Sequence, residues 1–388
     1  MKRVAVLGGG PAGAFAAERI AAAGIETVVI DEKLAWEKPC GGGITYKAYR
    51  DYPFLIDNHT PKKLIRQTNL AASSGSVDLQ LTKPLVIYSR YDLNRMLLDR
   101  AATAGAVLEK TRILGLERRG KEWIIETRAG SIGADFCLIA TGARNPLRNV
   151  GTQWSSGDMM ITVGYYVPAE RDQIDIQFFP QFEGYIWSFP RQGHLSVGIG
   201  GKGLPAHELR ARLERWMSAR DLPVRGSTFF GHVLPSLGHT AWSRNRIAGE
   251  GWMAVGDAGG LVDPVTGEGL YYAIRSADLA TKLVLADSHS PVEQPTVYRS
   301  LLYRDFTRDL ELGAHFAKRL FLGHFLYGSV PARLIQLMRR SPTVSAVVQD
   351  LFAGTQNYLE LRDRLFRSIR GTVRDVLRSV ATPQAGFG

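Results

Sequence analysis

The residues best suited to chemistry stand near the start of the chain, where the sequence reads Gly8-Gly9-Gly10-Pro11-Ala12-Gly13. The spacing Gly8-x-Gly10-x-x-Gly13 follows an apolar run and opens an alanine-rich segment. Gly8 permits a tight turn, Gly10 lets the backbone approach a pyrophosphate, and Gly13 lets helix and strand pack closely. A helix that begins there directs free N–H groups at the phosphates. The run therefore predicts a dinucleotide site.

The acid Asp31 completes this pattern. We expect strands over residues 4–7 and 27–30, a helix over 11–23, and Asp31 at the end of the second strand. A carboxylate at that place can accept hydrogen bonds from a ribose. Strand, turn, helix, strand and acid in this order favour dinucleotide binding over a glycine-rich turn without a ligand.

A second glycine cluster favours FAD over NAD as the dinucleotide. A strand expected over residues 252–255 is followed by Gly256 and Asp257, and Gly267 and Gly269 lead into a helix over 270–285. Asp257 can hold the ribityl chain of a flavin, although alone it could be a turn or cap residue. The helix start can direct N–H groups at the flavin N1 and C2 carbonyl, where negative charge collects on reduction.

Three further motifs bear on the family. They are the loop Pro39-Cys40-Gly41-Gly42-Gly43, the run Tyr185-Ile186-Trp187-Ser188-Phe189-Pro190, and Asp263-Pro264 followed by Gly267-x-Gly269-Leu270. Together with Arg90 ahead of a helix over 91–104, they resemble the geranylgeranyl reductase family within the p-hydroxybenzoate hydroxylase-like flavoproteins. The resemblance covers residues 1 to about 285. It departs at Thr141, where relatives often have Asp.

The resemblance implies which residues bind FAD and which face the substrate. FAD contacts are implied at Ala12, Asp31, Cys40, Gly41, Gly43, Arg90, Asp257, Gly269 and Leu270, with backbone around Leu114 near the adenine. Tyr185 and Trp187 would line the cavity over the flavin, or they are ordinary sheet aromatics. Cys40 would gate substrate or protons as a thiolate favoured by nearby N–H groups, or it is a small residue packed in a glycine loop.

The elements that must position these residues indicate an α/β fold. We expect a Rossmann-type FAD domain with an inserted antiparallel-sheet substrate domain and C-terminal helices. Strands are expected over 107–116, 123–127 and 136–140, and four short runs between 160 and 200 predict the antiparallel sheet. The expected FAD domain comprises 1–55, 88–150 and 245–290, the substrate domain 56–87 and 151–244, and the helical region 291–388.

A third glycine run, 198–203, also fits the dinucleotide spacing but lacks a second strand that ends in an acid. We expect it to close an antiparallel strand rather than to bind NAD(P)H. We expect no metal site, because the two cysteines, Cys40 and Cys137, have no zinc spacing and the eight histidines form no cluster.

The composition limits which binding partners and which cellular compartment are compatible with this chain. The 388 residues carry a net charge of +11, spread along the chain, with no basic run of the nucleic-acid type. Two cysteines, no signal peptide and no apolar stretch of about 20 residues favour a cytoplasmic protein. Residues 297–340 mix apolar side chains with arginines, which suits peripheral contact with anionic lipid or a helical cap. We favour the cap.

The residues predict an FAD-dependent oxidoreductase. We expect it to reduce C=C bonds of an apolar substrate, prenyl or other, by hydride transfer from reduced FAD. The alternatives are a monooxygenase that hydroxylates an aromatic substrate, a flavin-dependent halogenase and a non-catalytic flavin-binding module, since one scaffold supports several chemistries. An external electron donor is required, and NAD(P)H, ferredoxin and others stay open.

Overall fold

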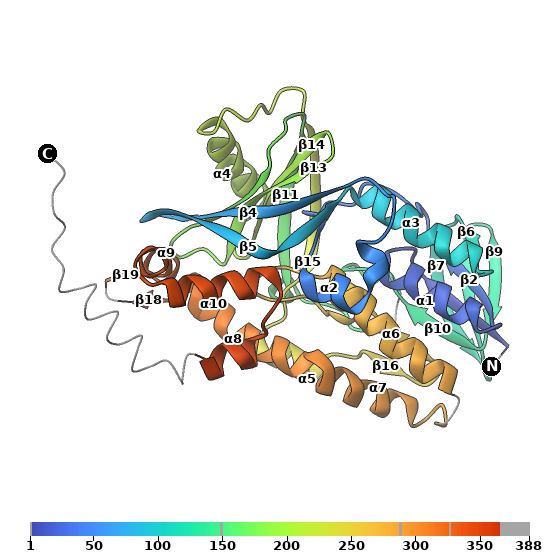
Figure 1. The fold of residues 1–388 in the computed structure, drawn as a ribbon. Coiled ribbons are helices and arrows are strands. Elements are labelled where there is room, and N and C mark those ends of the chain that lie inside the picture. Colours follow the sequence, from blue (N-terminus) through green and yellow to red (C-terminus); the bar gives the residue numbers. More distant parts are fainter. Residues whose placement is uncertain (1, 148–149, 287–288, 326, 365–388) are drawn as a thin grey trace, which may run out of the picture.

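The computed structural model describes residues 2–147, 150–286, 289–325 and 327–364, and it contains a parallel sheet beside a larger antiparallel one (Figure 1). The first sheet has the order β16-β17-β10-β1-β2-β6, and its strands are parallel except for β16 at the edge. Its strands are short apolar runs, as expected of a sheet that is covered on both faces. They are β1 Arg3–Leu7, β2 Glu26–Ile30, β6 Val107–Glu109, β10 Phe136–Ile139, β16 Ala248–Gly249 and β17 Trp252–Ala254.

Different layers cover the two faces of this sheet. Three helices pack on one face, with α1 Pro11–Ala22 between α3 Arg90–Thr103 and α6 Leu270–Ala286. A three-stranded sheet of β7 Ile113–Arg119, β8 Glu122–Thr127 and β9 Gly130–Ala134 covers the other face. Trp123 and Ile125 of that sheet pack with the fully buried Cys137, so Cys137 is a core residue.

The larger sheet has eight strands in the order β15-β11-β14-β13-β12-β4-β5-β3. Neighbouring strands are antiparallel except for β12 and β4, which run parallel. The bounds are β3 Gly43–Ile44, β4 Lys62–Ala72, β5 Gly75–Tyr88, β11 Met159–Val167, β12 Gln173–Phe178, β13 Gly184–Arg191, β14 His194–Gly201 and β15 Thr228–Pro235.

Helices also cover both faces of the larger sheet. Because side chains alternate along a strand, Ile186 of β13 faces α4 Ala206–Ser218, whereas its neighbour Trp187 faces the other way. On that second side lie α8 Arg308–Leu322, α9 Val330–Arg340 and α10 Pro342–Ala353 (Figure 1). These helices pack apolar side chains on the sheet, as a cap does. Within the described residues, none of the helices combines the length and apolar character needed to cross a bilayer.

The remaining elements are short or lie between these layers. They are α2 Tyr46–Asp51, α5 His239–Arg244, α7 Gln294–Leu302, β18 His324–Phe325, β19 Gly328–Ser329, a π turn Tyr303–Thr307 and the 3₁₀ turns Pro53–Leu55, Ser156–Asp158 and Gly256–Gly259.

Two expectations from the sequence need correction. The single strand expected over 107–116 is two strands in different sheets, β6 and β7, because the polar residues 110–112 interrupt the apolar run. Residues 62–88, where no strand was expected, form the long pair β4 and β5. The domain boundaries stay a prediction, and residues 365–388 of the expected helical region 291–388 lie outside the described residues.

Candidate functional site

The glycine turn after β1 has the geometry of a phosphate cradle. Gly8 has φ +117°, and a Cβ there would overlap the carbonyl of Ala140, while a Cβ on Gly13 would overlap the carbonyl of Gly8. A Cβ on Gly10, in contrast, would meet nothing within 4 Å. Two glycines are therefore required by the protein's own packing, whereas Gly10 faces open space at the start of α1, where a pyrophosphate fits.

Asp31 supports this turn from the end of β2. Its carboxylate accepts the N–H of Gly9 at 2.8 Å and the N–H groups of Lys33 and Leu34 at 2.7 Å each. The acid thus holds the glycine turn against the next loop. Its bond to a ribose stays a prediction.

The strand end at β17 and the start of α6 meet at Asp257. The carboxylate of Asp257 lies 3.1 Å from the Lys38 ammonium, and a Cβ on Gly269 would stand 3.2 Å from the Asp257 carboxylate. Burial would raise the pKa of Asp257, but Lys38, His232 and Arg90 together lower it, so the carboxylate is charged. Gly256 in turn lies against Ala12 of α1. Both glycine clusters therefore border one site.

Buried polar atoms without a partner mark where a cofactor fits. Arg90 Nε, Thr141 Oγ1 and His232 Nε2 are buried and accept or donate no hydrogen bond in the described protein. Arg90 is 3 % exposed, and its Nη2 donates to Asn94 at 3.2 Å. A buried polar group left unsatisfied costs about 1–3 kcal/mol, so a ligand or water that pairs with these atoms would stabilise the site. Together with the open space at Gly10, they fit FAD.

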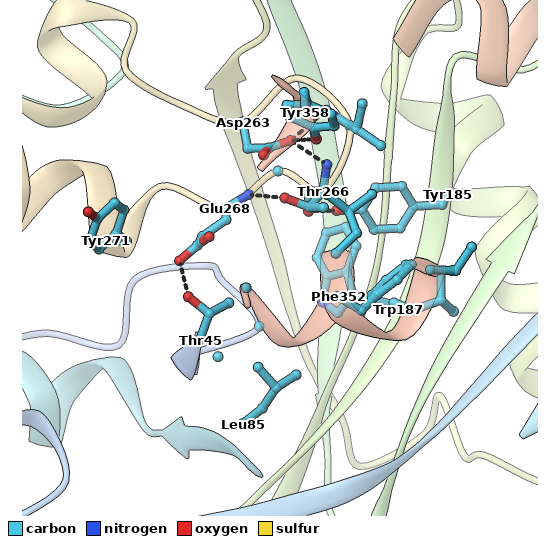
Figure 2. A pocket seen from close by; sticks show the side chains of 18 of the residues that line it. Thr45, Leu85, Tyr185, Trp187, Asp263, Thr266, Glu268, Tyr271, Phe352 and Tyr358 are labelled. Atoms are coloured by element: carbon cyan, nitrogen blue, oxygen red, sulfur yellow. Dashed lines mark hydrogen bonds between the residues drawn. The ribbon is translucent and has the colours of Figure 1, made fainter. Parts of the chain in front are cut away.

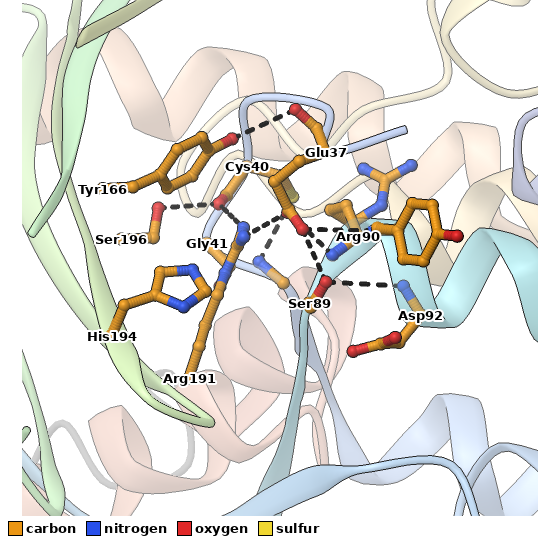
Figure 3. Close-up of polar contacts among 12 residues, drawn as sticks. Glu37, Cys40, Gly41, Ser89, Arg90, Asp92, Tyr166, Arg191, His194 and Ser196 are labelled. Atoms are coloured by element: carbon orange, nitrogen blue, oxygen red, sulfur yellow. Dashed lines mark hydrogen bonds and ion pairs between the residues drawn. The ribbon is translucent and has the colours of Figure 1, made fainter. Parts of the chain in front are cut away.

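The Cys40 loop packs tightly against β13 (Figure 3). Gly42 has φ +83°, and a Cβ there would overlap the carbonyl of Tyr88. A Cβ on Gly41 or Gly43 would stand 3.1 or 2.9 Å from the Phe189 ring, so both glycines let the loop reach that ring. The loop sequence is thus explained by close backbone approach.

The Cys40 thiol lies in a setting that favours its thiolate. The Gly42 N–H donates to Cys40 Sγ at 3.3 Å. Burial would raise the pKa of Cys40, but the guanidinium of Arg90, this N–H and the guanidinium of Arg191 together lower it. Cys137, in contrast, has a pKa raised by burial alone.

The aromatic run lies on β13, where alternation places Tyr185, Trp187 and Phe189 on one face. The Tyr185 hydroxyl donates to the carbonyl of Thr266 in the loop before α6. Trp187 stands opposite Gly198 of β14, and a Cβ on Gly198 would overlap the indole. Residues 198–201 of the run 198–203 therefore close an antiparallel strand, as expected, and the first glycine makes room for Trp187.

One cavity of about 800 Å³ joins these motifs (Figure 2). Its lining brings together eight of the predicted site residues: Cys40, Gly41, Gly43, Tyr185, Trp187, Gly267, Gly269 and Leu270. The opposite wall is apolar and comes from α8, α9 and α10, with Leu320, Leu334, Ile335, Val347, Val348, Leu351 and Phe352.

The cavity also has a polar end, which sequence reasoning missed (Figure 2). Asp263 accepts the Tyr358 hydroxyl at 2.6 Å, and Glu268 lies 2.8 Å from the Lys47 ammonium. Burial would lower the pKa of Lys47, but Glu268, Tyr272 and Asp263 together raise it well above its ordinary value. Tyr358 stands in the C-terminal segment, about 90 residues from the loop of residues 263–269, here called the flavin loop, so no local pattern could have found it.

The remaining predicted residues lie apart from the cavity. Leu114 is 59 % exposed on β7, and its contact with adenine stays a prediction. Sequence reasoning also missed Lys38, Glu37 and Arg191, although Arg191 directly follows the aromatic motif and Lys38 precedes the cysteine loop by one residue. Polar partners that come from distant segments leave no periodic pattern.

Comparison with known proteins identifies the family. Residues 2–158 match the pyridine nucleotide-disulphide oxidoreductase family model. The geranylgeranyl diphosphate reductase of Rhodobacter capsulatus is 30% identical over 304 residues, which cover 72% of this chain and 74% of the relative. A menaquinone reductase of Mycolicibacterium smegmatis is 26% identical over 366 residues, 86% and 89% of the two chains.

The fold matches a solved relative. A geranylgeranyl bacteriochlorophyll reductase-like protein of Thermoplasma acidophilum, 22% identical, superposes with a TM-score of 0.77 over 95% of this chain and 99% of that one. The glycine turn, the flavin loop and these similarities agree: the chain belongs to the geranylgeranyl reductase family and is an FAD-dependent oxidoreductase.

Proposed function

We propose that this enzyme reduces carbon–carbon double bonds of a long apolar substrate, of which an isoprenoid chain is the best match. The observation that carries the proposal is the cavity, whose apolar wall extends from Trp187 and the Cys40 loop to α8, α9 and α10. Its volume of about 800 Å³ includes the space beside Gly267 to Leu270 that bound FAD would share, and the whole lies in the upper part of the usual range for small-molecule sites, about 300–1,000 Å³. The names of the relatives, which are reductases, support the same substrate class.

The chain's own residues have separable tasks in such a reaction. The chemistry that reduced FAD supplies when bound is hydride donation to the double bond. The first turn of α6, which begins at Leu270 directly after Gly269, would direct its free backbone N–H groups at the flavin ring, whereas the Gly267 N–H is bonded within the loop to the carbonyl of Asp263. Trp187 and the wall of α8 to α10 exclude water and orient the chain. Cys40 Sγ, whose pKa is lowered, can hold or release a proton at the same end of the cavity.

The decisive experiment separates a reductase from a monooxygenase. The FAD-loaded protein is photoreduced without oxygen and mixed with a prenyl alcohol, a prenylated quinone or a simple aromatic compound. We expect flavin reoxidation by a prenyl compound under anaerobic conditions, with a saturated bond in the product. Reoxidation that starts only when oxygen is admitted, with a hydroxylated product, would overturn the proposal in favour of a monooxygenase.

A variant ties the result to the cavity. Leu334→Trp places an indole in the apolar wall and should slow reoxidation by long prenyl compounds without changing photoreduction. Leu64→Trp is the matched control, because Leu64 is 55% exposed on β4. Equal reoxidation rates in the two variants would exclude this cavity as the substrate site.

A further inference from the structure

Arg191, the last residue of β13, is fully buried and has every guanidinium nitrogen engaged (Figure 3). Nη1 donates to the Glu37 carboxylate and Nη2 to the carbonyl of Cys40, while Nε lies 3.4 Å from the carbonyl of Gly41. The guanidinium also stands 5.2 Å from the centroid of the Tyr166 ring. A single side chain thus binds two successive carbonyls of the cysteine loop.

Glu37 extends this contact to the parallel-sheet side of the protein. Its carboxylate accepts the Ser89 hydroxyl at 2.5 Å and the Arg90 N–H at 2.9 Å, at the start of α3. Burial would raise the pKa of Glu37, but Arg191 and these donors lower it, so the carboxylate is charged. The pair therefore connects β13, the cysteine loop and α3.

The carbonyl of Cys40 is the point on which these bonds converge. It accepts the Ser196 hydroxyl at 2.8 Å in addition to Arg191. Two donors on one carbonyl fix the plane of the peptide and with it the direction in which the Cys40 side chain leaves the backbone. Sγ then points where the Gly42 N–H can donate to it, in a residue that lines the cavity.

The Arg191 side chain is fully buried and that of Glu37 is 28% exposed. An ion pair in such a place is weak evidence for stability, because an apolar pair of similar volume is often as stable or more so. Removing one partner, in contrast, leaves an uncompensated buried charge. We therefore explain the contacts of Arg191 and Glu37 by the position in which they hold the cysteine loop, and not by a contribution to the stability of the fold.

We propose that Arg191 and Glu37 are positioning residues that hold the Cys40 loop, and through it the thiol, at the flavin end of the cavity. Neither of them lines the cavity, so they act through the loop backbone. The inference rests on the proposed function only in one respect, namely which reaction the Cys40 thiol takes part in. The placement of the loop itself can be tested without turnover.

The test measures how fast iodoacetamide alkylates Cys40 as a function of pH in the FAD-loaded protein. Mass spectrometry separates Cys40 from the buried Cys137, which reports global opening. The variants are Arg191→Lys and Glu37→Gln. Arg171→Lys is the matched control, because Arg171 pairs with Asp175 at 3.6 Å, away from the loop.

We expect Arg191→Lys and Glu37→Gln to raise the plateau rate of Cys40 alkylation about tenfold or more, because losing a hydrogen bond to a charged group makes local opening easier. Cys137 and the Arg171→Lys control should not change. If Glu37 acted only through its charge and did not position the loop, Glu37→Gln would lower the midpoint pH of Cys40 alkylation and leave the plateau rate unchanged.

Three outcomes would overturn the inference. They are an unchanged plateau rate of Cys40 alkylation in both variants, a shift of the midpoint pH in Glu37→Gln without a change of plateau rate, and an equal rise in the alkylation rate of Cys137. Should Arg191→Lys lose FAD, Glu37→Gln carries the same comparison. A protein with the loop effect that reduces no alkene would disprove the proposed function and leave this inference standing.

Discussion

The glycine turn offers a prediction in which two similar substitutions have opposite consequences. A Cβ on Gly13 would overlap a backbone carbonyl that cannot move without displacing β1. Overpacking of this kind costs about 1–3 kcal/mol. Gly13→Ala should therefore destabilise the protein even when FAD has been removed. With about 2–4 °C per kcal/mol for domains of 150–250 residues, the melting temperature should fall by roughly 2–12 °C.

Gly10→Ala should leave the stability of the FAD-free protein nearly unchanged and weaken FAD binding instead. Gly10 has extended backbone angles that alanine adopts freely, and its Cβ would meet nothing within 4 Å. The FAD-free variant should match the wild-type free energy of unfolding to within about 1 kcal/mol, since Gly10 is the N-cap of α1 and alanine caps a helix less well. Its affinity for FAD should fall by about tenfold or more, because the methyl group takes space along the pyrophosphate path.

Two measurements decide the matter: thermal unfolding of the FAD-free proteins and titration of flavin fluorescence with each variant. If Gly10→Ala binds FAD like the wild type, the open space at Gly10 is not where the pyrophosphate lies. If FAD-free Gly13→Ala is as stable as the wild type, the helix can withdraw from the turn and the packing argument fails.

Other features lead to further expected outcomes. Asp257→Ala should weaken FAD binding by about 10- to 100-fold, because losing a charged hydrogen bond costs about 1.5–3 kcal/mol. Cys40→Ala should weaken FAD binding less. Equal FAD affinities of the wild type and Asp257→Ala would show that Asp257 does not hold FAD. Because the pKa of Asp257 lies below its ordinary value of 3.8, its ion pair stabilises the fold above that value and is lost as pH falls through the lowered pKa. Asp257→Asn should therefore flatten the acid side of the unfolding profile, and an unchanged profile would show that the Lys38 pair adds nothing. Binding to anionic vesicles that weakens with salt would support a membrane-borne substrate, whereas protein that stays in the supernatant at low salt would favour the cap alone.

The sequence predicted those parts of the fold whose cause is local. The spacing of Gly8, Gly10 and Gly13 follows from contacts within one β-α-β unit, and the alternation around Trp187 follows from strand geometry. The presence of a parallel sheet and of an antiparallel sheet inserted along the chain also followed from apolar runs and their length.

The parts that were missed depend on distant partners. In β4 and β5 the register shifts between Ile65 and Gln67, which breaks the alternation, and part of their buried face is covered by helices more than 200 residues away. Tyr358, Lys38 and Arg191 find their partners across segments that are close only in the folded chain. No window of sequence contains both members of such a pair.

The far wall of the cavity comes from α8, α9 and α10, whereas the glycine turn and the flavin loop come from the first 270 residues. Substitutions in these helices can therefore lengthen, shorten or bend the space for a substrate while the cofactor contacts stay as they are. The two parts meet in several places, among them the stacked rings of Tyr185 and Phe321 and the bond between Asp263 and Tyr358, which follows α10. A change in the wall would be transmitted to the flavin loop through such contacts. Residues that select the substrate and residues that serve the redox chemistry can thus change at different rates in evolution. Contacts such as the bond between Tyr358 and Asp263 limit how independently they change.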